Sequence, residues 1–168
     1  DERRTKVTAV SGEVDIEDLI PEEDCVLTLT NFGYVKRQKT DTYKLQRRGG
    51  RGISGMSCRE EDVAAEMFVV NSHDYVMFFT NFGKVYRLKC YEIPEGSRVS
   101  KGTNVANLLP IMPDEKVTSM IKVPDFDGEK YLVMVTKSGV IKRTLLSAYD
   151  SARKGGLIAI DLDDGDEL

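Results

Sequence analysis

The sequence predicts an all-β fold made of repeated four-stranded units, as in a propeller. Three observations support this prediction: a β-hairpin motif occurs three times, each copy is followed by further short apolar runs, and helical periodicity is almost absent. A four-stranded unit that recurs every forty to fifty residues is typical of a propeller blade. Such units must stack, because one small sheet cannot bury both of its faces alone.

The hairpin motif is the clearest repeat. It reads TNFGYVKR at 30–37, TNFGKVYR at 80–87 and, more loosely, TKSGVIKR at 136–143. Each copy follows an apolar, β-rich run, at 25–30, 75–80 and 131–136. Glycine at the fourth position suits a turn with positive φ, so each copy predicts a hairpin.

The second half of each unit repeats as well. Gly52 lies nineteen residues after Gly33 and Gly102 nineteen after Gly83, while Gly155 and Gly156 come slightly early in the third copy. Short apolar runs follow at 53–56, 105–109 and 157–160, and strand candidates close the first two units at 64–70 and 117–123. We therefore expect three units, at about 15–70, 71–123 and 124–168.

Composition indicates a folded, intracellular protein without a membrane segment. Hydrophobic residues make up 40% of the 168 positions, yet no apolar run approaches the roughly 18 residues of a spanning helix. The amino-terminal residues do not resemble a signal peptide. Cys25, Cys58 and Cys90 are far apart and His73 lies near none of them, so we expect reduced structural thiols and no metal site.

Charge is distributed in alternating blocks. The formal net charge is -4, which by itself disfavours a nucleic-acid partner. The segment 34–54, however, carries seven basic residues and one acid, and 84–101 and 137–154 carry five basic residues each. Acidic residues gather between these blocks, at 13–24, 60–66 and 161–167. This spacing predicts positive charge along one rim of the stacked units.

The densest basic segment is QRRGGRG, at 46–52. Arginine offers a rigid bidentate donor to phosphate, and consecutive glycine N–H groups can form a concave anion site. The segment lacks the Lys-Ser/Thr ending of a nucleotide-binding P-loop, so nucleotide hydrolysis is a poor fit. The alternative is a glycine-rich turn whose arginines are only solvated.

QRRGGRG resembles the gyrase-A box, the signature of the C-terminal domain family of the DNA gyrase A subunit, with Arg51 where lysine is also common. The segment DERRT at 1–5 resembles the end of the preceding core domain, so residues 1–14 are expected to be core or linker. EDLIP at 17–21 resembles the start of the C-terminal domain. The resemblance implies a β-pinwheel, in which neighbouring blades exchange strands, and about three of its usual six blades. Two blade faces are then expected to be exposed, giving an open arc or an oligomeric contact.

The resemblance also implies a function. The domain would bind and wrap duplex DNA without sequence preference, and the box would complete the wrap that negative supercoiling requires. The chain itself is expected to be neither an enzyme nor a cofactor-binding unit. The parent would be an ATP-dependent type II topoisomerase with ATP and Mg on other domains. It would join the gyrase B subunit in a heterotetramer through the core domain, in the bacterial cytoplasm at the nucleoid.

Candidate DNA contacts are the cations and box residues that recur in step with the units. They comprise Lys36, Arg37, Lys39, Lys44, Gln46, Arg47, Arg48, Gly49, Gly50, Arg51, Gly52, Arg87, Arg98, Lys101, Lys142, Arg143, Arg153 and Lys154. Side chains alternate along a strand, so only one member of each adjacent pair can face the same way as its counterparts.

Other interpretations remain open at this stage. The equivalent domain of topoisomerase IV has a similar fold but usually a degenerate box, and a protein-binding propeller or a phosphate-handling enzyme is also conceivable. Tyr34, Tyr43 and Tyr86 would suit stacking on single-stranded bases. Phe32, Phe78, Phe79, Phe82 and Met134 are expected to be core residues.

Overall fold

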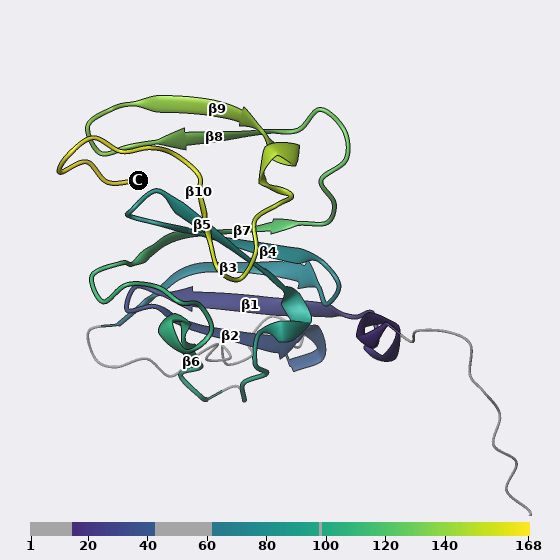
Figure 1. The fold of residues 1–168 in the computed structure, drawn as a ribbon. Coiled ribbons are helices and arrows are strands. Elements are labelled where there is room, and N and C mark those ends of the chain that lie inside the picture. Colours follow the sequence, from purple (N-terminus) through teal and green to yellow (C-terminus); the bar gives the residue numbers. More distant parts are fainter. Residues whose placement is uncertain (1–14, 43–61, 98) are drawn as a thin grey trace, which may run out of the picture.

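The computed structural model describes residues 15–42, 62–97 and 99–168 (Figure 1). The described part of the chain contains ten strands and five short 3-10 turns, and none of its residues is in an α-helix. The elements are η1 (Ile16–Leu19), β1 (Asp24–Thr30), β2 (Tyr34–Lys39), η2 (Thr40–Thr42), β3 (Ala64–Asn71), β4 (Tyr75–Thr80), β5 (Lys84–Lys89), η3 (Cys90–Glu92), β6 (Thr103–Asn104), η4 (Val105–Asn107), β7 (Val117–Val123), β8 (Tyr131–Val135), β9 (Ile141–Leu145), η5 (Leu146–Tyr149) and β10 (Leu157–Ile158). The all-β prediction is confirmed.

The strands form three sheets, and the first two contain a strand taken from the following repeat. The first sheet has the order β3-β1-β2-β6, the second β10-β5-β4-β7, and the third consists of β8 and β9. β6 follows the second hairpin in sequence but pairs with β2 of the first, and β10 pairs with β5 in the same way. Figure 1 shows the third repeat reaching down to β5 through β10. Neighbouring blades therefore exchange strands.

The three predicted hairpins are present, and glycine makes their turns possible. Gly33, Gly83 and Gly139 have φ of 79°, 72° and 91°, a region that residues with a Cβ rarely adopt. In each turn the glycine N–H donates to the carbonyl of the threonine three residues earlier, at 2.9 to 3.0 Å. The strands that follow are antiparallel, with Val35, Val85 and Ile141 opposite Leu29, Phe79 and Val135.

The apolar run 105–109 forms a 3-10 turn instead of a strand. The Asn104 side chain accepts a hydrogen bond from the Ala106 N–H at 2.9 Å and so caps η4. The exchanged strand β6 lies just before the run, and Val105 and Leu109 are buried as part of the core. In the third repeat β10 covers only the first half of the predicted run, and the run at 53–56 lies outside the described residues.

The core consists of two apolar layers between consecutive sheets. Leu27, Leu29 and Val35 of the first sheet pack with Phe78 and Tyr86 of the second. The opposite face of the second sheet, including Met77, Phe79 and Val85, packs with Met134 and Leu146 of the third repeat. Burial of Phe78, Phe79 and Met134 confirms their prediction as core.

Phe32 and Phe82 are not core residues, so that prediction was wrong. Their side chains are 50% and 44% exposed. Each is the third residue of its four-residue turn, where the chain reverses between the two paired strands.

Two exposed sheet faces were expected. One face is uncovered, and a second face is partly exposed. Tyr131, Val133, Val135, Ile141 and Leu145 are all exposed on one face of the β8–β9 pair, at the end of the stack in Figure 1. On one face of the first sheet, Val26, Lys36 and Gln38 are buried, whereas Met67 and Val69 of the neighbouring strand β3 are exposed. In the described segments, no helix is long and apolar enough to cross a bilayer.

Candidate nucleic-acid interface

The last two residues of each hairpin motif, Lys36-Arg37, Tyr86-Arg87 and Lys142-Arg143, lie on opposite faces of their sheet. Lys36, Tyr86 and Lys142 are equivalent and lie opposite Thr28, Phe78 and Met134. Arg37, Arg87 and Arg143 lie on the other face, opposite Leu27, Met77 and Val133. In the first two sheets, the face that carries the arginine packs toward the next repeat. The arginines therefore have different surroundings from the residues that precede them.

Lys36 is fully buried, contrary to the prediction that it lies on a DNA-facing surface. Its Nζ donates to the carbonyl oxygens of Ser97 and Ser100 at 3.0 and 2.9 Å. These residues belong to the segment 94–102, which we call the second-repeat loop and which corresponds to the box in the repeat. Because none of its surface is accessible, Lys36 cannot contact a phosphate in this conformation.

Arg37 and Arg87 link consecutive repeats. The Arg37 Nε donates to the carbonyl of Ile93 at 3.0 Å. The Arg87 guanidinium forms an ion pair with Asp150 at 2.8 Å and lies 4.4 Å above the Tyr75 ring. Both arginines thus hold a segment of the next repeat, and their predicted role as exposed phosphate contacts finds no support in this geometry.

Three further predicted cations lie at the strand ends and on the third hairpin. Lys39 is exposed and forms an ion pair with Glu23 at 3.2 Å, which raises the pKa of the Lys39 ammonium. The Lys142 Nζ donates to the carbonyl of Ala159 at 2.9 Å. The exposed Arg143 lies 4.4 Å above the Tyr131 ring, on the uncovered face of the third sheet.

The cations of the loops are exposed. Lys101 lies in the second-repeat loop, 5.5 Å from the centre of the Tyr34 ring, and its side chain faces solvent. Arg153 and Lys154 are exposed in residues 150–156, which we call the third-repeat loop. Within the described ranges, none of these three cations takes part in an ion pair. They are therefore available for an external anion.

Glycines allow both loops to lie against the preceding sheet. Gly102 has φ of +84°, and a Cβ there would lie 2.5 Å from the carbonyl oxygen of Val35. Gly156 has φ of +86°, and its Cβ would lie 2.6 Å from the Tyr86 ring. Tyr86 is therefore buried beneath a loop and is not available for base stacking.

The remaining predicted residues lie outside the described part of the chain. They are the box itself, Lys44, Arg98 and Tyr43, together with Cys58 and residues 1–14. Their assignment stays a prediction from sequence.

A set of acidic residues that the sequence reasoning missed supports the hairpin turns. Asp62 accepts from the Phe32 N–H at 3.1 Å, and Asp166 from the Ser138 N–H at 2.9 Å. Hydrogen bonds from Ser138 and Thr136 hold the pKa of Asp166 well below its usual range. The acid that recurs before each closing strand is a signal in the repeat that could have identified this set.

Glu115 occupies the equivalent position in the second repeat but is directed inward. It accepts hydrogen bonds from the hydroxyls of Thr80 and Tyr86 at 2.7 and 3.0 Å and from the Met112 N–H at 2.9 Å. Burial and the Glu115 carboxylate raise the pKa of Tyr86 to about 12. Both Glu115 oxygens are thus engaged in internal bonds.

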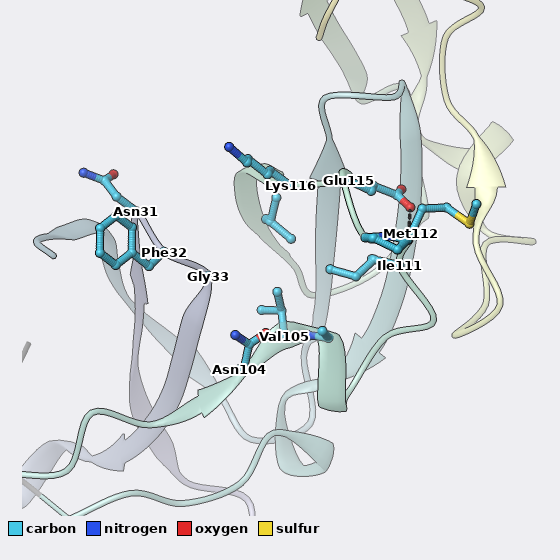
Figure 2. A pocket seen from close by; sticks show the side chains of 12 residues that line it. Asn31, Phe32, Gly33, Asn104, Val105, Ile111, Met112, Glu115 and Lys116 are labelled. Atoms are coloured by element: carbon cyan, nitrogen blue, oxygen red, sulfur yellow. Dashed lines mark hydrogen bonds between the residues drawn. The ribbon is translucent and has the colours of Figure 1, made fainter. Parts of the chain in front are cut away.

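A pocket of about 500 Å³ lies between the first hairpin turn and the 104–117 segment (Figure 2). Figure 2 shows Asn31 and Phe32 on one side and Ile111, Met112 and Glu115 on the other. The Asn104 side chain is occupied in capping η4, and the Glu115 carboxylate is occupied by its neighbours. These two polar groups of the lining are therefore not free to orient a substrate.

Cys25, Cys90 and His73 have structural roles. Cys25 and Cys90 are buried and reduced, and burial together with the nearby Cys25 raises the pKa of Cys90 to about 12. Such a thiol is a poor nucleophile at neutral pH. His73 is held by the carbonyl of Ile20 at 2.8 Å, and no group of metal-binding side chains occurs within the described ranges.

Comparison with known proteins gives consistent results. The chain matches the family described as "DNA gyrase C-terminal domain, beta-propeller" over residues 26–71, 74–124 and 130–168. The DNA gyrase A subunit of Clostridium acetobutylicum is 51% identical over 168 residues, which are all of this chain and 20% of that protein. This chain thus spans about one fifth of the length of that relative.

Two solved structures share the fold. The C-terminal domain of DNA topoisomerase IV aligns with a TM-score of 0.74 and 30% identity, over 88% of this chain and 45% of that one. The C-terminal domain of DNA gyrase A aligns with a TM-score of 0.68 and 31% identity, over 86% of this chain and 45% of that one.

Proposed function

Because the chain belongs to the DNA gyrase C-terminal domain family, we propose that it binds duplex DNA without sequence preference and bends it around the outer rim of its stacked sheets. The observation that carries the proposal is the repeated exposure of cations that form no ion pair with the described residues. These are Lys101 in the second-repeat loop and Arg153 and Lys154 in the third-repeat loop. The box would supply the corresponding contacts in the first repeat.

The recurrence of these loops in successive repeats suits a bent duplex. Bending 20–30 base pairs through 40–90° costs on the order of 1–6 kcal/mol, so the contacts must recur along the curve to offset it. One cationic loop per repeat provides this recurrence. Since phosphates are identical along the duplex, the contacts carry no base specificity.

Internal pairing separates the cations that bind DNA from those that hold the protein together. Arg87 already has a carboxylate partner and an aromatic ring, and Lys36 has two carbonyls. A phosphate would have to displace these partners, whereas it would only displace water and counterions from Lys101, Arg153 and Lys154.

Duplex affinity measured against salt concentration tests the proposal. The triple variant Lys101→Met, Arg153→Met, Lys154→Met should reduce the slope of log affinity against log salt by up to about three, or about one per lost phosphate contact. The matched control Lys116→Met, Lys122→Met, Lys130→Met removes the same charge from positions outside the basic blocks. Equal losses in both variants, or a flat profile in the unmodified protein, would contradict the proposal and favour a protein-binding scaffold.

The parent protein is proposed to be the A subunit of DNA gyrase, which acts with the B subunit and ATP in introducing negative supercoils. In this view wrapping is the contribution of the present chain, and strand cleavage takes place on other domains. The domain of topoisomerase IV remains the second candidate, because its solved structure aligns well with this chain.

The box distinguishes the two candidates. In a reconstituted enzyme, replacing Arg47, Arg48 and Arg51 with alanine should abolish supercoiling and leave relaxation and decatenation intact. An enzyme that never supercoils would count against gyrase, and supercoiling that survives the replacement would contradict the role proposed for the box.

A further inference from the structure

We infer that Lys36 is a positioning residue, which holds the cation-bearing second-repeat loop in place from the preceding sheet. The inference rests on the proposed function, because it assigns how one of the proposed DNA contacts is fixed. Lys36 itself is fully buried and contacts no DNA.

Lys36 binds both ends of a turn within the second-repeat loop. Ser97 and Ser100 form a turn in which the Ser100 N–H donates to the Ser97 carbonyl at 3.1 Å. The Lys36 ammonium donates to the carbonyls of both residues, at 3.0 and 2.9 Å. Charge-assisted hydrogen bonds of this kind are stronger than neutral ones, so a single side chain fixes the turn relative to β2.

The rest of the loop follows β2 closely. The Arg37 N–H donates to the Pro94 carbonyl at 3.2 Å, and the Gly96 N–H donates to the Arg37 carbonyl at 2.9 Å. Gly96 also lies against the Lys36 stem, since a Cβ there would be 3.1 Å from the Lys36 Cβ and Cδ. The loop therefore contacts Lys36 both through backbone carbonyls and through Gly96.

Different side chains hold the third-repeat loop against the second sheet. Tyr86 occupies the position of Lys36 and presses its ring against Gly156, while its hydroxyl bonds to Glu115 and not to the loop. The third-repeat loop is held instead by Arg87, whose N–H donates to the Arg153 carbonyl at 3.4 Å and whose guanidinium pairs with Asp150. In the second-repeat loop, by contrast, one buried ammonium reaches both ends of the turn.

The contacts of Lys36 with Ser97 and Ser100 fix the position of Lys101. Lys101 follows Ser100 directly, and its ammonium lies 5.5 Å from the Tyr34 ring centre of the preceding sheet. A cation held by a rigid loop loses less conformational freedom on binding than one on a mobile loop. Releasing Ser97 and Ser100 should therefore weaken the phosphate contact of Lys101 although its charge is unchanged.

The test is a double-mutant cycle in the full-length protein that contains this sequence, with duplex affinity measured against salt. Lys36→Met keeps the apolar stem and removes the ammonium that donates to Ser97 and Ser100, and should reduce the salt slope by about one, as Lys101→Met does. The double variant should show no greater reduction than Lys101→Met alone. Lys130→Met, which removes an exposed cation paired with Asp125, should leave the slope unchanged.

Additive losses in the double variant, or an unchanged slope in a folded Lys36→Met protein, would overturn the inference. If Lys36→Met fails to fold, Gly102→Ala disturbs the contact between the same loop and β2 without removing a charge, because its Cβ would lie 2.5 Å from the Val35 carbonyl oxygen. An unchanged slope in Gly102→Ala would also overturn the inference. A flat salt profile in the unmodified protein would instead refute the proposed function.

Discussion

Replacing Gly102 with alanine should separate backbone strain from the close approach that seats the second-repeat loop. The residue has φ of +84°, and a Cβ there would lie 2.5 Å from the Val35 carbonyl oxygen. Gly128 provides a matched control, since its φ is +78° but nothing lies within 4 Å of its Cβ position. The two variants share the conformational cost and differ only in the contact.

The contact accounts for the expected difference in stability between the two variants. Alanine in the left-handed region costs about 1–2 kcal/mol, and the lower entropy of the unfolded chain returns about 0.4–1 kcal/mol. Gly128→Ala should therefore change the free energy of unfolding by less than about 2 kcal/mol. Gly102→Ala adds overpacking against a backbone oxygen, which cannot rotate away, and should cost about 1–3 kcal/mol more.

Chemical denaturation of both variants measures this difference, and duplex affinity of the folded proteins measures its effect on the loop. We expect Gly102→Ala to lower both stability and affinity, and Gly128→Ala to leave affinity unchanged. Equal stability losses in the two variants would refute the argument that the loop is seated by close backbone approach.

Three further predictions concern burial and pH. Tyr86→Phe should cost about 1–3 kcal/mol, because Glu115 loses a buried donor. Since the pKa of Tyr86 is raised from 10.0 to about 12, the stability that its neutral hydroxyl contributes is complete below pH 10 and is lost between pH 10 and 12. Alkaline denaturation should therefore show a smaller loss of stability over this range in Tyr86→Phe than in the unmodified protein, while the Cys90 thiol titrates in both. The lowered pKa of Asp166 stabilises the fold at neutral pH, and this stability should decline as the pH falls below the usual value of 3.8. Asp166→Asn should remove that decline in an acid titration followed by circular dichroism. Phe32→Ser should change the free energy of unfolding by less than about 1 kcal/mol, since the ring is half exposed, and a loss of about 3 kcal/mol or more would restore Phe32 to the core.

The repeat in the sequence was sufficient to predict the hairpins and their turns. The spacing of Gly33, Gly83 and Gly139 identified positions that the backbone requires to be glycine. Strand exchange could be expected only from the family resemblance, because pairing of β6 with β2 joins residues about seventy positions apart. The periodicity of the sequence predicts which segments are strands but does not predict which strands pair.

The direction of each basic side chain could not be predicted from sequence. Alternation requires that Lys36 and Arg37 face opposite ways, but the partners of Lys36 are carbonyls about sixty residues later. A carbonyl has no sequence signature, so nothing in the residues marks Ser97 and Ser100 as acceptors. The exposed turn position of Phe32 was more accessible to reasoning, since a turn with Gly33 at its end leaves the preceding side chain outside the sheet.

The most direct test of DNA wrapping measures the path of the duplex on the protein. Nicked circular DNA is mixed with the full-length protein that contains this sequence, sealed by a ligase and freed of protein, and the change in linking number is measured. We predict a change of one sign that grows with bound protein and is reduced in the variant lacking the cations at Lys101, Arg153 and Lys154. Sealed circles whose linking number does not respond to the protein would contradict the claim that the rim bends duplex DNA.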